Sequence, residues 1–376
     1  MSSVLGTYAR EAISFTEGRG SYLYTENGGK YLDFVQGIAT NVLGHCHKHL
    51  VKEIQNQSKK LWHVSNAFVI PEQEKLAKRL TDNTFADFVC FQNSGTEATE
   101  ASIKIARKYF HKIGKPEKNR IITTKGSFHG RTLAALFAAN NPKHTEGFGP
   151  KVEGFDQVPF ADHEAIKKAI NKNTAAIMIE TIMGEGGIKV VPDYCIKGLR
   201  ELCDEHKILL ILDEVQCAYR TGDFFAFEKS GITPDIVPIA KGIGGGFPLG
   251  ACLVTKKVSV GMTPGTHGST FGGNPLAMVA GNAVLDIIFE KDFLNNVKKK
   301  GKYFDESLNK IKNTYPKIIG EIRGIGLIKG LKMLVDNVEF IKKLMNHKML
   351  TVKAEENVIR LFPPLIVENK ELDEAI

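Results

Sequence analysis

The stretch Ile208-Leu209-Leu210-Ile211-Leu212-Asp213 decides the fold of this chain. Its five apolar residues do not alternate with polar ones, which is typical of a central strand that is buried on both faces of a sheet. Between about residue 60 and residue 260, other apolar runs of strand length alternate with helical patterns. These runs are 88–91, 121–124, 175–180, 236–240 and 251–255. The sequence therefore predicts an α/β fold in which helices cover both faces of the sheet.

The two ends of the chain follow a different pattern. Residues 21–24 and 30–34 alternate around the turn Asn27-Gly28-Gly29, which predicts a β-hairpin. After about residue 275 long helices return, followed by short strands near 326–334 and 358–362. We therefore expect a large domain over residues 51–275 and a smaller domain assembled from residues 1–50 and 276–376.

The charge balance narrows the choice of partners. The chain has 376 residues, and 50 Lys and Arg against 42 Asp and Glu give a net charge of +8. Such a surplus suits anionic small molecules and nucleic acid alike, but the basic residues are spread among apolar ones in the predicted helices at 98–112 and 296–312. Because the sequence has neither zinc-finger spacing nor an isolated basic arm, we expect no nucleic-acid partner and no metal site.

The cysteines and the N-terminus indicate the compartment. Six cysteines are scattered without a Cys-x-x-Cys pair, as in reduced proteins of the cytoplasm. The first residues lack a basic segment followed by an apolar run, and no apolar stretch is long enough to span a membrane. We expect a cytoplasmic protein that does not contact membranes.

Two charged residues follow buried strands. Asp213 comes directly after the run 208–212, at the sheet edge where open α/β folds place ligands. A carboxylate is costly there unless it meets a cation or a protonated ring, although Asp213 or Glu214 could simply cap the next segment. Lys241 ends the run 236–240 and enters a glycine-rich loop, a setting that suits a Schiff-base nucleophile, a phosphate-binding lysine or a solvated one. Walker and Rossmann glycine spacings are absent from this loop, which disfavours nucleotides.

Further polar groups occur where the predicted strands give way to helices. Asn93-Ser94-Gly95-Thr96 leads into a helix whose free N–H groups favour a phosphate or carboxylate, unless Ser94 and Thr96 are ordinary caps. Phe128-His129-Gly130-Arg131 offers an aromatic ring and a guanidinium that could clamp a carboxylate, against the alternatives of a core residue and a surface charge. The hydroxyls of Ser269 and Thr270 could contact a phosphate or simply cap the next helix. Arg360 is a second candidate for clamping a carboxylate.

Taken in this order, the segments resemble class III aminotransferases of pyridoxal phosphate (PLP) fold type I, and most closely acetylornithine aminotransferases. The resemblance runs from residues 31–34 and 37–45 to Arg360-Leu361-Phe362-Pro363-Pro364 and covers almost the whole chain. It implies an aspartate aminotransferase-like fold, with a mostly parallel seven-stranded sheet in the large domain and a smaller α+β domain from both chain ends.

The resemblance also implies a PLP site in a homodimer. Lys241 would bind the cofactor aldehyde, Asp213 would pair with the ring nitrogen, and Thr270 would reach the phosphate in the neighbouring subunit. Gly95 and Thr96 would bind the phosphate, Phe128 would stack on the ring, Val215 would pack under it, Gln216 would lie near the phenolic oxygen, and Ser94, His129 and Glu214 would complete the site.

For the substrate, the resemblance assigns Arg131 and Ser269 to acetylornithine, Arg360 to the α-carboxylate and Glu185 to a gate near Arg360. Ser65 and Asn66, in His63-Val64-Ser65-Asn66, would line the same site. The tyrosine that ornithine aminotransferases use for the free α-amino group has no counterpart in 37–41, which favours the acetylated substrate.

Two departures from the family pattern affect the expected loops. Thr181-Ile182-Met183 replaces the usual Pro-Val-Gln, which removes one amide. Cys217-Ala218-Tyr219 precedes Arg220 where the family has two glycines in a loop that is one residue longer.

The implied reaction moves the terminal amino group of N2-acetylornithine to 2-oxoglutarate, giving N-acetylglutamate 5-semialdehyde and glutamate, a step of arginine biosynthesis. Asp213 would keep the ring nitrogen protonated. Lys241 would act as general base and acid for the proton that leaves the substrate carbon. The alternatives are transamination of ornithine, succinylornithine or 4-aminobutyrate, an aminomutase of the glutamate-1-semialdehyde type, and a non-catalytic PLP-binding protein.

Overall fold

A seven-stranded sheet forms the centre of the computed structural model, which describes residues 3–376. The strands lie in the order β4-β12-β11-β10-β7-β5-β6, and only the pairings of β12 with its two neighbours are antiparallel. Their bounds are β4 (Phe88–Gln92), β5 (Arg120–Thr124), β6 (Phe155–Val158), β7 (Thr174–Glu180), β10 (Leu209–Asp213), β11 (Ile236–Ile239) and β12 (Gly250–Val254). The predicted mostly parallel sheet is confirmed.

Six of these strands coincide with the apolar runs of the sequence, whereas β6 was not predicted from them. Its sequence Phe-Asp-Gln-Val lacks an apolar run, and its two middle residues are only half-buried. As the last strand in the order, β6 pairs only with β5, so it needs no continuous apolar surface.

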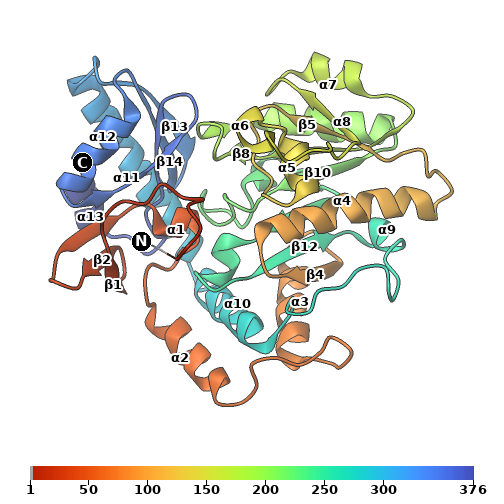
Figure 1. The fold of residues 1–376 in the computed structure, drawn as a ribbon, viewed down its shortest axis with the longest axis horizontal. Helices are drawn as coiled ribbons and strands as arrows, with labels where there is room; N and C mark the ends of the chain where they lie inside the picture. The colour runs from red at the N-terminus through yellow and green to blue at the C-terminus, as the bar shows by residue number, and fades with distance from the viewer. Residues whose placement is uncertain (1–2) are drawn as a thin grey trace.

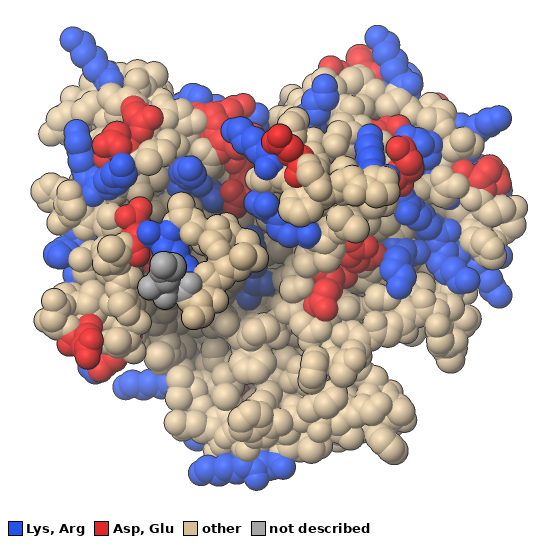
Figure 2. All heavy atoms as spheres, viewed as in Figure 1, with Lys and Arg blue, Asp and Glu red and all other residues tan. Residues whose placement is uncertain are grey.

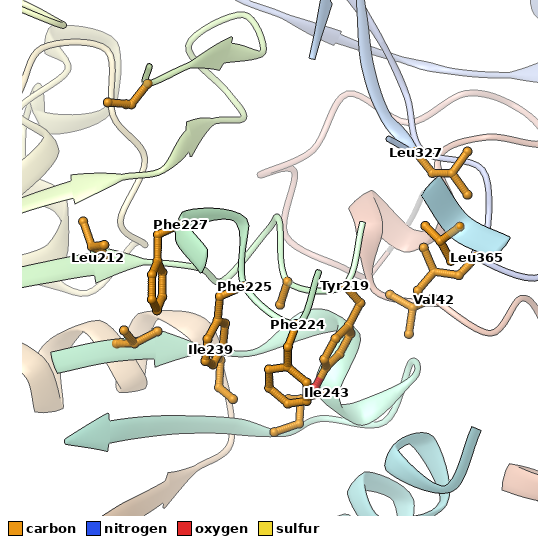
Figure 3. Packing of buried hydrophobic residues seen from close by; sticks show 14 of the residues in the cluster. Val42, Leu212, Tyr219, Phe224, Phe225, Phe227, Ile239, Ile243, Leu327 and Leu365 are labelled. Atoms are coloured by element: carbon orange, nitrogen blue, oxygen red, sulfur yellow. The ribbon is translucent and has the colours of Figure 1, made fainter. Parts of the chain in front are cut away.

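Helices cover the sheet and create two apolar cores (Figure 1). Leu209 and Ile211 pack on one side with α4 residues such as Ile105, while Leu210 and Leu212 belong to the core on the other side. Figure 3 shows this second core, where Leu212 lies near Phe227. The helices and turns of this part are α2 (Lys48–Ser58), α3 (Pro71–Asn83), α4 (Gly95–Lys112), α5 (Leu133–Ala139), α6 (Pro142–Thr145), α7 (His163–Ala169), α8 (Asp193–Glu205), the 3-10 turns η1 (Ala226–Ser230) and η2 (Lys241–Gly244), α9 (Lys256–Ser259) and α10 (Pro275–Ile288).

Both chain ends fold beside this sheet (Figure 1). The predicted hairpin is formed by β2 and β3, and β15 from the C-terminal part pairs in parallel with β3. The elements are β1 (Phe15–Arg19), β2 (Tyr22–Thr25), β3 (Lys30–Asp33), β13 (Ile319–Ile325), β14 (Ile328–Met333), β15 (Met349–Leu350), β16 (Val352–Ala354), β17 (Val358–Leu361), α11 (Phe293–Thr314), α12 (Asn337–Asn346) and α13 (Asn369–Ala375), with the small pair β8 (Ile182–Met183) and β9 (Lys189–Val190) after β7. The domain boundaries at residues 50 and 275 stay a prediction.

The short turn α1 (Gln36–Ala39) has an unusual backbone. All four of its residues, including Ile38, have φ between 48° and 66°, in the left-handed region that side chains other than glycine rarely adopt. The carboxylate of Asp33 holds the start of this turn, since its Oδ1 accepts hydrogen bonds from Val35 N at 2.8 Å and Gln36 N at 3.1 Å. The turn leads directly into Thr40.

Two expectations about the whole chain can be compared with the described residues. Among residues 3–376, no helix is long and apolar enough to cross a membrane. All six cysteines are free thiols, in agreement with the prediction that they are reduced.

Candidate active site

A cavity of about 440 Å³ opens where several strands of the large sheet end. Its walls come from the residues that follow β4, β10 and β11, which is the edge where parallel sheets bind ligands. Predicted site residues that line it are Ser94, Gly95, Thr96, Phe128, His129, Arg131, Glu185, Asp213, Val215, Gln216 and Lys241. The fold thus brings together most of the residues that the sequence analysis singled out.

Lys241 lies half-buried in the cavity wall at the start of η2. Its backbone is left-handed, with φ of 48°, and within residues 3–376 its amine makes neither a hydrogen bond nor an ion pair. Burial, followed by the positive charge of Arg360, lowers the pKa of Lys241 to about 8. About a tenth of this amine is therefore neutral at pH 7, far more than for an ordinary lysine, and the neutral form is the nucleophile.

Asp213 and His129 form a buried pair at the base of the cavity. Nδ1 of His129 lies 2.8 Å from Oδ2 of Asp213, and the other carboxylate oxygen accepts a hydrogen bond from Val215 N at 3.0 Å. Burial alone would lower the pKa of His129, but the hydrogen bond and the charge of Asp213 outweigh it, so that the pKa is raised. The pair places a fixed acceptor group at the end of β10, with the imidazole behind it.

Glu180, at the end of β7, also lines the cavity and was not identified as a site residue from the sequence. Its two carboxylate oxygens accept hydrogen bonds from Phe128 N at 2.7 Å and Gly184 N at 3.1 Å. Burial raises the pKa of Glu180 to about 7, against the lowering effect of His129. A signal was present, because Glu180 ends a buried strand just as Asp213 does.

The N-terminus of α4 forms another wall of the cavity. Oγ of Ser94 accepts a hydrogen bond from Glu97 N at 3.4 Å. Ser94 is therefore an N-cap of α4, which was one of the two roles considered for it from the sequence. A Cβ on Gly95 would lie 2.7 Å from Cγ1 of Val215, which means that only glycine allows this close approach. Oγ1 of Thr96 accepts hydrogen bonds from the backbone of Arg131 and Thr132, each at 3.2 Å, and ties the loop after Phe128 to the helix.

The two arginines of the expected substrate site differ in exposure. Arg131 is exposed at the cavity, with its guanidinium carbon 5.4 Å from the centre of the Phe128 ring. Arg360 on β17 is buried and forms an ion pair with Glu185, with distances of 2.7 and 3.0 Å between their nitrogen and oxygen atoms. Arg360 reaches the cavity only through Glu185, which lines it.

Besides Arg360 and Glu214, four predicted residues lie outside this cavity. Ser65, Asn66, Ser269 and Thr270, which we call the outer group, belong to two loops that are joined by hydrogen bonds from Asn66 Nδ2 to the carbonyls of Ser269 (3.1 Å) and Gly272 (2.9 Å). Thr270 is exposed. A hydrogen bond of 3.2 Å from Asn93 to Oγ of Ser269 connects the outer group to the cavity wall.

Glu214 also lies outside the cavity, and its assignment as a cofactor-binding residue stays a prediction. Its carboxylate accepts hydrogen bonds from Ala226 N and from the thiol of Cys217, both at 3.1 Å. Burial raises the pKa of Glu214 to about 7. Because neighbouring residues at the end of a strand face opposite sides of the sheet, Asp213 faces the cavity and Glu214 faces the next loop.

Comparisons with known proteins agree with this geometry. The family model described as "Aminotransferase class-III" matches residues 7–376. The chain is 54% identical to the acetylornithine aminotransferases of Agrobacterium fabrum (98% of this chain, 93% of the relative) and Mesorhizobium japonicum (100% and 94%).

Solved structures are similar too. The chain resembles the ornithine aminotransferase of Toxoplasma gondii with a TM-score of 0.95 at 30% identity, over 99% of this chain and 90% of that one. It resembles the N-acetylornithine aminotransferase of Stenotrophomonas maltophilia with a TM-score of 0.85 at 32% identity, over 98% and 94%. The chain belongs to the class III aminotransferases.

Proposed function

We propose that the chain transfers the terminal amino group of N2-acetylornithine to 2-oxoglutarate, with PLP as cofactor. The observation that carries the proposal is the placement of Lys241, whose amine has no partner within residues 3–376, in one cavity with the Asp213–His129 pair. The choice of donor is supported by relatives that are named acetylornithine aminotransferases and are 54% identical.

The residues of the cavity suit this cofactor. Bound PLP supplies an aldehyde that a lysine amine can attack and a ring that accepts the electron pair of a substrate C–H bond. In our proposal Asp213 holds a proton on the ring nitrogen, while His129 fixes its carboxylate. The N-terminus of α4, with Gly95 and Thr96, receives the phosphate, because its free N–H groups and helix dipole favour anions. Lys241 accepts and returns the proton at the substrate carbon, since its pKa of about 8 lies close to neutral pH.

The two arginines divide the substrates between them. Arg131, exposed beside Phe128, binds the carboxylate far from the reacting amine. Arg360 binds the α-carboxylate of glutamate and 2-oxoglutarate, which replaces Glu185 as its partner. Acetylornithine reacts through its terminal amine and places no carboxylate beside the reacting carbon, so the Glu185–Arg360 pair stays closed for it.

The proposal includes a cytoplasmic homodimer with its active sites at the interface, and the domain division at residues 50 and 275. Thr270 is exposed in the single chain, and large apolar side chains are exposed on or beside the two loops that the Asn66 hydrogen bonds join: Trp62, Phe68, Val69 and Phe271. In Figure 2, few charged side chains are visible on the surface over α10 and the loop between α2 and α3. Exposed apolar surface of this kind is typical of protein interfaces.

Half-reaction spectra with a panel of donors test the proposal. The PLP-loaded protein is mixed separately with acetylornithine, ornithine, succinylornithine, 4-aminobutyrate and glutamate, and loss of the cofactor's absorbance near 420 nm is followed. Acetylornithine and glutamate should react fastest, and borohydride should attach PLP to Lys241 and to no residue in Lys241→Ala. A tenfold faster reaction with another ω-amino donor would show that this donor, and not acetylornithine, is the substrate. Attachment of PLP to another lysine would refute the proposed site.

A further inference from the structure

Tyr219 has two unfavourable features at a single position. Its φ is +68°, in the left-handed region where a tyrosine is rare. Its side chain is completely buried, and its hydroxyl finds no hydrogen-bond partner in the described part of the chain. Outliers of this kind persist only where the surroundings impose them, and they gather at functional sites.

The loop around Tyr219 imposes this conformation. Tyr219 N donates a hydrogen bond to the carbonyl of Phe224 at 3.1 Å, and Gly222 N donates to the carbonyl of Tyr219 at 3.0 Å, which closes a tight turn. Tyr219 ends the segment Cys217-Ala218-Tyr219, where the resemblance led us to expect two glycines. The chain therefore keeps a bulky aromatic residue where glycine would be free of strain.

The ring of Tyr219 packs against the residue that follows Lys241. A Cβ on Gly242 would lie 2.8 Å from Cγ1 of Val42, and 3.6 Å from Cδ2 and 3.8 Å from Cε2 of Tyr219, so Val42 and the tyrosine ring share the space beside Gly242. The ring also makes an edge-to-face contact with Phe224, with the ring centres 4.9 Å apart and the planes nearly perpendicular. Figure 3 shows Tyr219 beside Phe224 and Ile243, a residue of η2. Lys241, the residue before Gly242, also has a left-handed φ of 48°. The contact between Tyr219 and Gly242 therefore connects one strained residue with the immediate neighbour of another.

We propose that Tyr219 is a positioning residue for Lys241. Together with Val42, its ring fills the space behind the Lys241–Gly242 peptide and prevents this peptide from relaxing out of the left-handed conformation that places the amine in the cavity. A smaller side chain would leave room behind Gly242, and the strain at Lys241 would then favour relaxation. The inference rests on the proposed function only in taking Lys241 as the aldehyde-binding residue.

The experiment compares capture of PLP with stability in the full chain freed of cofactor. Capture is followed by absorbance near 420 nm and by borohydride trapping on Lys241, and stability by the Tm before PLP is added. Tyr219→Leu should slow capture about tenfold or more. Tyr219→Phe keeps the ring, so it should capture PLP at the rate of the unmodified chain, with a higher Tm because the unpaired hydroxyl is gone.

Phe225→Leu is the matched control, because Phe225 is buried in the same core and contacts Phe224 without approaching Gly242. It should lower the Tm about as much as Tyr219→Leu and leave capture unchanged. Unchanged capture in Tyr219→Leu, or equally slow capture in Phe225→Leu, would overturn the inference. Tyr219→Met, which retains more volume, replaces Tyr219→Leu should that variant not fold. If the unmodified chain captures no PLP, the proposed function fails instead.

Discussion

The buried cavity and the outer group differ in how complete they are within one chain. The cavity contains Lys241 and the hydrogen-bonded pair of Asp213 and His129, which lie at the end of one strand of the large sheet or on segments that follow other strands of it. The outer group lies on two loops, and its Thr270 is exposed and does not line this cavity. The difference fits our proposal that a single chain holds the groups for bond chemistry, whereas a second copy completes the periphery of the site.

The largest effect should come from the centre of the cavity. Asp213→Asn keeps the size of the side chain and removes its charge, so the protonated ring loses its partner. We expect turnover to fall on the order of a thousandfold or more, the scale of electrostatic partners of a transition state. Steady-state kinetics measure it, and Asp156→Asn, which breaks a peripheral ion pair with Arg120, is the control. A loss below tenfold for Asp213→Asn would show that the cavity lacks the proposed centre.

The two arginines should sharpen the comparison, since one is buried and one is exposed. Arg360→Lys should damage the reaction with glutamate and spare acetylornithine. Arg131→Lys should weaken both, by roughly 2–5 kcal/mol, because lysine cannot make the bidentate contact to a carboxylate. Single-turnover rates for both donors in both variants decide the matter, and equal losses in Arg360→Lys would contradict the division.

Hybrid dimers test whether the outer group serves the neighbouring cavity. Thr270→Ala should raise the dissociation constant of PLP roughly tenfold, the scale of a lost hydrogen bond to a charged group. Mixed with Lys241→Ala chains, it should form hybrids with one intact site, in which Lys241 of one chain meets Thr270 of the other. The PLP affinity of the active site in these hybrids should therefore return to that of the unmodified chain, and a PLP affinity in verified hybrids that stays as weak as in Thr270→Ala alone would place Thr270 within its own chain's site.

The smallest expected effect is the dependence of cofactor capture on pH. Only the neutral amine attacks an aldehyde, and the pKa of Lys241 is about 8, so capture should rise with pH through this value and level off above it. Between pH 7 and pH 9 the rate should change about tenfold. Thr270→Ala should lower the rate without moving the midpoint. A midpoint near 10.5, the ordinary value of a lysine, would mean that Lys241 is not desolvated.

Much of the cavity was predictable because its residues follow continuous apolar strands. The runs before Asp213 and Lys241 identify both residues as lying at one sheet edge, and the structure places them together. The edge strand β6 escaped detection because a strand with one neighbour needs little apolar surface. Strand alternation could have placed Glu214 on the opposite side from Asp213, but it was not used to assign Glu214.

Contacts between distant segments were beyond reach of sequence patterns. The hydrogen bond between His129 and Asp213 joins residues 84 positions apart, and it depends on how two loops settle over the sheet. Tyr219 gave no local sign of its left-handed backbone, because that conformation follows from the closed turn around it. Patterns predict which residues line an edge, whereas partners are determined by tertiary packing.

The left-handed turn at Gln36–Ala39 has a consequence for engineering. A residue other than glycine in the left-handed region costs about 1–2 kcal/mol of stability relative to a right-handed conformation. Three of the four residues in this turn are not glycine. Selection for heat resistance should therefore readily accept glycine or asparagine at these positions. The turn leads into Thr40, which lines the cavity. A library screened for heat resistance alone would thus accumulate changes beside the substrate site. The Tm would rise in such variants, while their catalytic activity would be left unselected and could fall.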